Sequence, residues 1–196
     1  IMGQLPAVIR AYGVLDFEPS RLLSHLDELV PDLDDGSLVT CVYGIFDPFT
    51  RECVLATAGH LRPLQLGPDG CHELQLPENT PLGVGGRGFT SIRFNLQPGR
   101  SLVLYTDGVI ERRSQDLDSA VTQVREALAH RYTATPGDIA DTAIKAVPGP
   151  AEDDQALLVI KSEPTALAYR RIRLPALPEA VGDARRATKE TFAAWG

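Results

Sequence analysis

The sequence has few cysteines and no long hydrophobic run, and each absence excludes a class of protein. Its three cysteines, Cys41, Cys53 and Cys71, are odd in number and show no Cys-x-x-Cys spacing. We therefore expect reduced, structural thiols in a cytoplasmic protein and not a disulfide framework. No apolar stretch approaches the about 20 residues that a membrane-spanning helix needs, and no signal peptide is recognisable. We expect no membrane partner.

The sequence also lacks an excess of positive charge. Its formal net charge is −7, which argues against a nucleic-acid partner because such partners normally require a basic surface. The negative balance suits a protein that gathers carboxylates around cations. With 196 residues, 43% of them apolar and 23% charged, the chain can form one globular domain and part of another.

Residues 101–113, SLVLYTDGVIERR, carry the clearest chemical signal. An apolar run lies between a Pro-Gly pair and Asp107-Gly108, which is the pattern of a buried strand that ends in a tight turn. A carboxylate at that point is held by rigid backbone at the edge of a loop, where it can bind a hard cation. Taken alone, Asp-Gly is more typical of an ordinary turn than of a metal site.

A second acidic segment strengthens the interpretation as a metal site. Glu152, Asp153 and Asp154 precede the apolar, β-prone run QALLVIK. In an antiparallel sheet the end of one strand adjoins the start of its neighbour, so Asp107 and these acids can converge on one metal centre. The alternative is a solvated acidic loop, which the Pro-Gly-Pro just upstream fits equally well.

Hydrophobic periodicity predicts the remaining elements. Apolar residues at helical spacing predict helices over residues 2–12, 19–33, 119–131 and 136–147, with Ser20 as the cap of the second. Alternating or apolar runs predict strands over residues 38–46, 53–58, 63–66, 72–76 and 89–96, with two hairpins among them. The glycine-rich residues 81–88 lack the Lys-Ser/Thr of a P-loop and suggest a mobile flap.

Four segments together resemble a known family: ATAGHLRPLQL, PLGVG, LVLYTDGVIERR and DDQALLVIK, in that order. They are similar to the metal-dependent protein phosphatases of the 2C class (PPM type), in the bacterial sporulation stage II E-like branch, over about residues 2–161. The resemblance implies an α+β fold, a four-layer α-β-β-α sandwich of two antiparallel sheets. It also implies two Mn²⁺ or Mg²⁺ ions between the sheets and a water, bound to metal, as the nucleophile.

The same resemblance assigns metal ligands. Asp107 and Asp153 match two metal-binding aspartates of the family, and a shift of one position would place Asp154 in the site instead of Asp153. Gly108 would contribute either a backbone contact to metal or the loop conformation. No side chain is expected to act as the catalytic nucleophile.

Three further residues are candidates to line the site. His60 follows a glycine at a strand end, and the pattern favours a histidine that braces a loop over one that lines the cleft. Arg62 could bind phosphate through its guanidinium, although a solvated arginine is the favoured interpretation. Glu111 matches an acid common in the family, and its alternative is an exposed salt bridge with a neighbouring arginine.

One family motif is missing. The first metal motif, Asp-Val-x-Gly-His-Gly with the bridging aspartate, should lie just before Ile1, and nothing else in the chain resembles it. The chain also begins with Ile before its only methionine. We therefore expect a phosphatase domain that is N-terminally truncated and lacks its first strands.

The last residues have a different character. RIRLPALPEAVGDARRATKETFAAWG resembles the opening strand and helix of anti-sigma-factor kinases in the histidine-kinase-like ATPase superfamily. The segments that would bind ATP lie beyond the end, so we expect no nucleotide site. The predicted organisation is a phosphatase domain over residues 1–162, a linker over 163–167 and the start of a kinase-like domain over 168–196.

The resemblance implies a protein serine/threonine phosphatase in sigma-factor signalling. Its substrate would be a phosphorylated anti-anti-sigma factor, and an anti-sigma kinase domain in the same polypeptide would be a partner. Two alternatives remain open: a non-catalytic phosphatase-like module that regulates or binds a protein, and a module that binds Mg²⁺ or a phosphopeptide without turnover.

Overall fold

The structure is a computed structural model that describes residues 8–10, 12, 17–33, 38–85, 88–113, 115–150, 153–163, 186, 189 and 190. The chain divides into two compact units, Ile1–Pro164 and Thr165–Gly196. Most of the predicted linker and kinase-like segment lies outside the described residues, as does most of the predicted helix over residues 2–12. The fold described below is that of the first unit.

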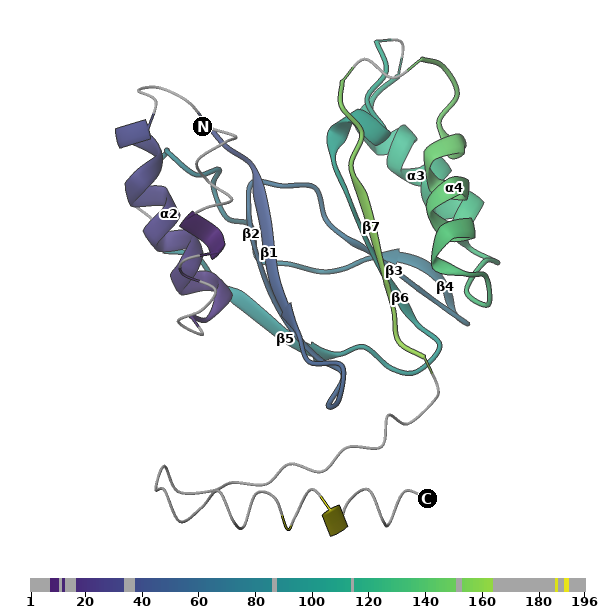
Figure 1. Ribbon diagram of the computed structural model, residues 1–196. Helices are drawn as coiled ribbons and strands as arrows, with labels where there is room; N and C mark the ends of the chain where they lie inside the picture. Colours follow the sequence, from purple (N-terminus) through teal and green to yellow (C-terminus); the bar gives the residue numbers. More distant parts are fainter. Residues whose placement is uncertain are drawn as a thin grey trace. The chain divides into compact units, whose positions relative to one another are not determined.

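Two antiparallel sheets form the centre of this unit (Figure 1). The first has the strand order β1-β2-β5 and comprises β1 (Cys41–Phe46), β2 (Glu52–Ala58) and β5 (Ser91–Asn95). The second has the order β4-β3-β6-β7 and comprises β3 (Leu64–Gly67), β4 (Gly70–Glu73), β6 (Ser101–Tyr105) and β7 (Leu157–Lys161).

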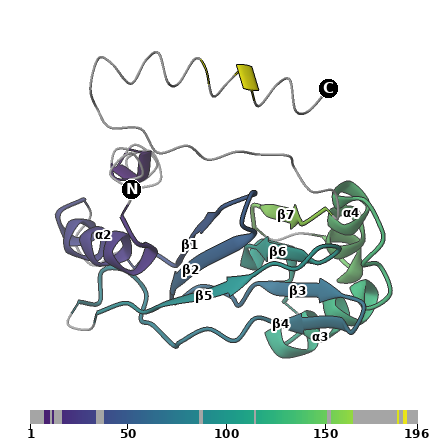
Figure 2. The same cartoon turned by 90° about the horizontal axis from the view of Figure 1, so that it is seen from below.

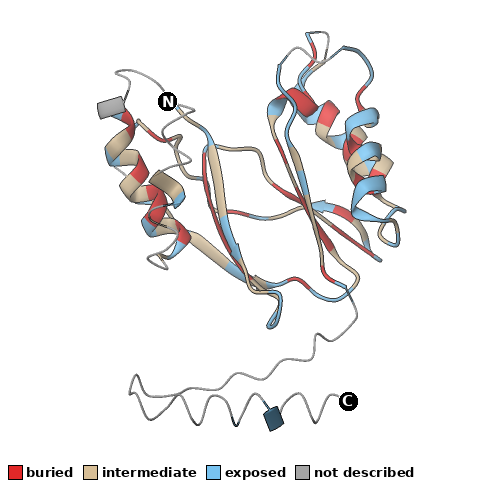
Figure 3. Cartoon of the chain, viewed as in Figure 1, coloured by how far each residue is buried: buried red, intermediate tan, exposed pale blue. Residues whose placement is uncertain are grey.

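Helices cover the outer faces of both sheets. The two views agree that α2 (Pro19–Leu33) lies on the three-stranded sheet, and that α3 (Leu117–Leu128) and α4 (Pro136–Ala146) lie on the four-stranded sheet (Figures 1 and 2). Buried residues gather on the helix sides that face the sheets (Figure 3). The predicted four-layer α-β-β-α sandwich is therefore confirmed.

Three hydrophobic clusters hold these layers together. One lies between the sheets and includes Leu55, Leu96 and Leu102, each at most 1% exposed. The other two pack α2 against its sheet, and α3 and α4 against theirs. Cys53 and Cys71 are buried parts of these clusters, and all three cysteines are free, as predicted.

Several element boundaries differ from the predicted ones. Strand β4 begins at Gly70, two residues before the predicted start, because the tight turn is complete at residue 69. Helix α3 begins at Leu117, where the Asp116 carboxylate caps it by accepting a hydrogen bond from the Ser119 N–H at 2.9 Å. Ser20 lies inside α2, whose first residue is Pro19, so the predicted cap is wrong.

Helix α4 begins as predicted, at a proline. Its cap is Thr135, whose hydroxyl accepts a hydrogen bond from the Asp138 N–H at 3.2 Å and donates one to the Asp138 carboxylate at 2.7 Å. This local arrangement fixes where the helix starts.

The pairing of β6 with β7 continues beyond the two strands. Past their far end, the Gly99 N–H donates to the Ser162 carbonyl at 2.6 Å, and the Ser162 N–H donates to the Arg100 carbonyl at 2.9 Å. These bonds close the end of the pair that lies away from Asp107. Within the described ranges, no helix combines the length and the apolar character that crossing a membrane requires.

Candidate metal centre

The first acidic position, Asp107, lies just after β6, in a 3₁₀ turn. Its carboxylate accepts a hydrogen bond from the Gly108 N–H at 2.9 Å. Its carbonyl oxygen accepts bonds from the N–H groups of Ile110 at 2.8 Å and Glu111 at 2.7 Å. Asp107 itself is exposed, whereas the strand before it is largely buried. The rigid strand therefore fixes the Asp107 backbone while the carboxylate faces solvent.

The second acidic segment lies directly beside this turn. Asp153 and Asp154 precede β7, and Tyr105 at the end of β6 pairs with Leu157 at the start of β7. The adjacency that the antiparallel argument predicted is therefore present in the backbone. Both acids are exposed, and the Asp153 carboxylate accepts a hydrogen bond from the Asp154 N–H at 2.7 Å.

Side chains tie the two segments together. The Thr106 hydroxyl donates to the Asp154 carbonyl at 3.3 Å and accepts from the Ala156 N–H at 3.0 Å. The Gln155 amide donates to the Gly108 carbonyl at 3.1 Å. The turn after β6 and the segment before β7 are thus joined by side-chain hydrogen bonds.

Gly108 allows these segments to approach closely. A Cβ at this position would lie 3.0 Å from the Asp153 carbonyl oxygen and 2.9 Å from the Asp154 carbonyl carbon, and these are backbone atoms that cannot turn aside. Its own carbonyl accepts hydrogen bonds from Gln155 and Arg112. Of the two roles expected for Gly108, its described contacts therefore support the one in the loop conformation, where it lets the two segments pack closely.

His60 lies between the two sheets at the same end of the molecule. Its Nε2 is 3.2 Å from the Tyr105 carbonyl oxygen, and its Nδ1 is 3.2 Å from the Thr40 hydroxyl. Burial lowers the pKa of His60 below its ordinary value of 6.5, and this effect outweighs the Tyr105 carbonyl and the Asp107 charge, which both raise it. Both ring nitrogens are engaged, as in a bracing histidine, and the ring stands near Asp107.

The remaining predicted residues have other contacts. Arg62 forms an ion pair with the exposed Glu78 at 3.4 Å. Glu111 is exposed, and its neighbour Arg112 donates to its backbone carbonyl at 2.6 Å. The structure therefore brings the acids and His60 together, whereas the Arg62 side chain pairs with Glu78 and the described bonds of Glu111 are made by its backbone.

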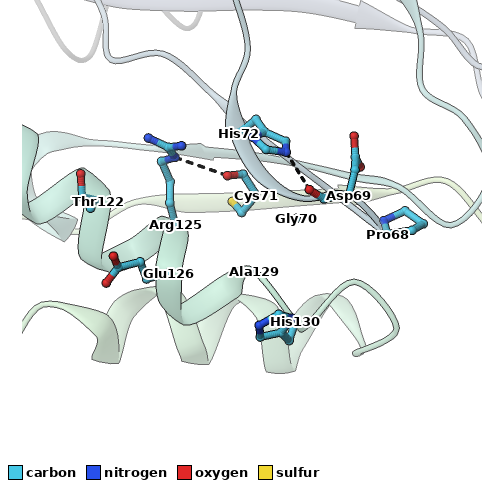
Figure 4. Close-up of a pocket in the computed structure, with 10 residues that line it drawn as sticks. All are labelled: Pro68, Asp69, Gly70, Cys71, His72, Thr122, Arg125, Glu126, Ala129 and His130. Atoms are coloured by element: carbon cyan, nitrogen blue, oxygen red, sulfur yellow. Dashed lines mark hydrogen bonds between the residues drawn. The ribbon is translucent and has the colours of Figure 1, made fainter.

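Two hollows lie along α3 and β4. One, of about 430 Å³, is lined by His60 and Arg62 together with residues of α3. The other, of about 470 Å³, lies at the β3–β4 turn and contains none of the predicted site residues (Figure 4). In it Arg125 donates to the Cys71 carbonyl at 3.3 Å and His72 contacts the Asp69 carbonyl at 2.8 Å.

The acidic residues suit a hard divalent cation. Mg²⁺ is commonly bound by one or two carboxylates, with water and substrate phosphate completing its shell. Asp107 with Asp153 or Asp154 offers such a pair at adjacent strand ends, and the absence of a side chain at Gly108 lets the two acidic segments approach each other closely. Within the described ranges, no group of three or more His, Cys, Asp or Glu residues is arranged to hold a metal. The residues present therefore fit one part of a metal site.

The sequence analysis did not identify the residues that join the turn after β6 to the segment before β7. Thr106 and Gln155 sit one position from predicted ligands, and their roles depend on the register between β6 and β7. Arg112 is 7% exposed. Nothing in the sequence distinguishes it from the adjacent Arg113, which is exposed.

A family model, Stage II sporulation protein E (SpoIIE), matches residues 1–163 of the chain. Among solved structures, the RsbU and RsbW domains of Rv1364c from Mycobacterium tuberculosis are 26% identical, with a TM-score of 0.76. That match covers 98% of this chain and 55% of the other, so the chain spans about half the length of this relative.

Two further solved structures share the fold. The SiaA-PP2C domain of Pseudomonas aeruginosa is 16% identical with a TM-score of 0.63, over 80% of this chain and 64% of that one. The phosphatase domain of the cell fate determinant SpoIIE from Bacillus subtilis, presoaked with manganese, is 14% identical with a TM-score of 0.53, over 86% of this chain and 76% of that one. At these identities the likeness concerns the fold alone.

Proposed function

The chain belongs to the stage II sporulation protein E (SpoIIE) family and has the fold of the 2C-class (PP2C) phosphatases, and we propose that it acts as a protein serine/threonine phosphatase domain. The observation that carries this proposal is the adjacency of two acidic segments. The turn that bears Asp107 and the segment that bears Asp153 and Asp154 lie at neighbouring ends of β6 and β7.

In this proposal Asp107 and Asp153, or Asp154 in its place, hold manganese or magnesium. When bound, such an ion supplies Lewis-acid chemistry that neutralises phosphate charge and lowers the pKa of water. The family resemblance implies two ions in the intact site, and the SpoIIE phosphatase domain was presoaked with manganese for one of its structures. The backbone of this chain contributes preorganisation, because strand pairing sets the acid positions before any ion binds.

The reaction would be hydrolysis of a phosphoserine or phosphothreonine. A water oxygen forms a bond to phosphorus, the bond from phosphorus to the side-chain oxygen breaks, and that oxygen takes up a proton. His60 is neutral near pH 7, because burial lowers its pKa. Its role in this proposal is therefore to fix the sheets beside Asp107 and not to carry charge.

The proposed substrate is a phosphorylated anti-anti-sigma factor. Two observations support a role in sigma-factor regulation: the family membership, and the likeness to a protein that contains both RsbU and RsbW domains. That likeness extends over 98% of the chain and so includes the second unit. It supports the proposal that residues 168–196 begin an anti-sigma kinase-like domain after a linker over 163–167.

The test is manganese-dependent release of phosphate from a phosphoserine peptide. It should use the protein in its full native length, since this chain spans about half of its mycobacterial relative. We expect release with the wild type and a loss of at least about a hundredfold in Asp107→Asn, because a ligand is removed. Asp141→Asn is the matched control, since Asp141 is an exposed acid on α4 paired with Lys145. Equal rates in Asp107→Asn and wild type would overturn the proposal.

A second candidate function is a non-catalytic phosphatase-like module that binds a regulatory protein. One observation favours it: the described residues supply no metal-binding group of three or more His, Cys, Asp or Glu side chains. This candidate predicts no phosphate release at any manganese concentration, together with binding of the phosphorylated peptide that Asp107→Asn leaves intact.

A further inference from the structure

Arg112 is a buried arginine beside the acidic turn. Arg112 is only 7% exposed, yet its guanidinium keeps its positive charge at any physiological pH. A buried charge is costly unless it is hydrogen-bonded, so the partners of this group show what it does.

Its partners are backbone carbonyls. One terminal nitrogen donates to the carbonyls of Gly108 at 3.3 Å and Glu111 at 2.6 Å. The other donates to the carbonyls of Val109 at 3.5 Å and Val147 at 3.3 Å. Within the described part of the chain, its Nε is buried without a partner. The planar fork of arginine suits such an arrangement, because its donors diverge in fixed directions.

These carbonyls come from two separate parts of the chain, the turn after Asp107 and the end of α4. Three lie in the turn that follows Asp107, and the fourth belongs to Val147, the residue that ends α4. Carbonyls at a helix C-terminus carry partial negative charge and favour a cation. The chain then continues toward Asp153, and a Cβ on Gly149 would lie 3.6 Å from the Arg112 Cδ. Arg112 therefore bridges the turn after Asp107 and the residues that follow α4 on the way to Asp153.

We propose that Arg112 is a positioning residue that fixes the Asp107 turn relative to the segment leading from α4 to Asp153. Its guanidinium holds carbonyls of both parts at once. The link to metal binding rests on the proposed function, whereas the link between the two segments does not. Lysine keeps the charge but cannot reach diverging carbonyls at once, and glutamine has neither the charge nor the fork.

The first experiment is amide hydrogen exchange, followed by mass spectrometry, on wild type, Arg112→Lys, Arg112→Gln and Arg93→Gln. The last is a matched control, because Arg93 forms an exposed ion pair with Glu52 on the other sheet. Peptides that cover residues 107–111 and 153–156 should exchange about tenfold faster in both Arg112 variants, the change expected when local opening loses one or two hydrogen bonds. Peptides from β2 and β5 should be unchanged.

Two exchange results would overturn the proposal. If Arg112→Lys matches the wild type, charge alone is enough and the fork has no positioning role. If both variants exchange faster throughout the domain, Arg112 supports the fold in general and not the two segments.

The second experiment separates metal affinity from turnover in the same variants. We expect the manganese concentration for half-maximal phosphate release to rise about tenfold to a hundredfold in Arg112→Gln, the range seen when residues behind metal ligands are removed. The rate of phosphate release at saturating manganese should change far less. A loss of that rate without a rise in the half-saturating manganese concentration would contradict the inference. If the wild type releases no phosphate, the proposed function fails, and the exchange result still decides the role of Arg112.

Discussion

His60 Nε2 lies 3.2 Å from the Tyr105 carbonyl oxygen, and this contact joins the two sheets beside the acidic turn. A carbonyl only accepts hydrogen bonds, so Nε2 carries the proton of the neutral ring. Nδ1 then accepts from the Thr40 hydroxyl at 3.2 Å. His60 follows β2 and Thr40 precedes β1, whereas Tyr105 ends β6. One imidazole therefore connects segments from both sheets.

This arrangement predicts a pH-dependent stability. Burial lowers the folded-state pKa of His60 below 6.5, so the unfolded chain binds the proton more readily. Stability is therefore fully present above about pH 6.5 and is lost as the pH falls toward the folded pKa. Between about pH 7.5 and pH 5.5, the wild type should lose up to about 1 kcal/mol more unfolding free energy than His60→Gln.

Denaturant unfolding at the two pH values measures this difference. His130→Gln is the control, since His130 is exposed. If the unfolding free energies of wild type and His60→Gln depend equally on pH, the buried imidazole is not the cause of the pH dependence.

The choice between Asp153 and Asp154 can be made by substitution. We expect Asp153→Asn to raise the half-saturating manganese concentration at least about tenfold, because its position matches a family ligand. Asp154→Asn should change it little, because the Asp154 backbone already anchors the loop through its carbonyl bond to Thr106. Isothermal titration with manganese measures both. The reverse order of effects would assign the ligand to Asp154.

Gly108→Ala should push the two acidic segments apart. The added Cβ meets backbone atoms of Asp153 and Asp154 and cannot be accommodated by side-chain rotation. We expect a loss of about 1–3 kcal/mol in unfolding free energy, as for overpacked sites. Gly137→Ala is the matched control, because its Cβ would make only an ordinary contact, 3.8 Å from the Thr135 hydroxyl. It should be neutral or slightly stabilising. A Gly108→Ala protein as stable as the wild type would show that the segments can separate freely.

The cysteines should react slowly in the folded protein. Burial raises the pKa of Cys53 and Cys71 to about 11, so little thiolate exists near neutral pH. We expect alkylation by iodoacetamide to be at least about a hundredfold slower in the native than in the unfolded protein. Cys41 has a pKa of about 11 for the same reason but is only half-buried, so it should react first. Mass spectrometry of digested protein gives the order, and rapid labelling of Cys53 would contradict the prediction.

Much of the fold could be predicted because its signals are local. The apolar run before Asp107 and the run after Asp154 each predicted a strand, and both are present as β6 and β7. The adjacency of the acids followed from antiparallel pairing alone. The boundary of β4 was less predictable, because the tight turn at residues 68–69 decides where pairing resumes.

The supporting contacts could not be predicted from the sequence. His60 joins Thr40 and Tyr105, residues 20 and 45 positions away, so only the packed sheets bring them together. Arg112 is buried and Arg113 is exposed because the turn after Asp107 directs one side chain inward, and adjacent identical residues carry no sequence signal for that choice.

The backbone bonds that join Ser162 to Gly99 and Arg100 have a mechanical consequence. The first unit ends just past Ser162, and β7 connects that point to Asp153 at its opposite end. Fraying of β7 from this end would first have to break these two hydrogen bonds. The last residues of the first unit are therefore held against the segment before β6, at the end of the strand pair that lies away from the acids.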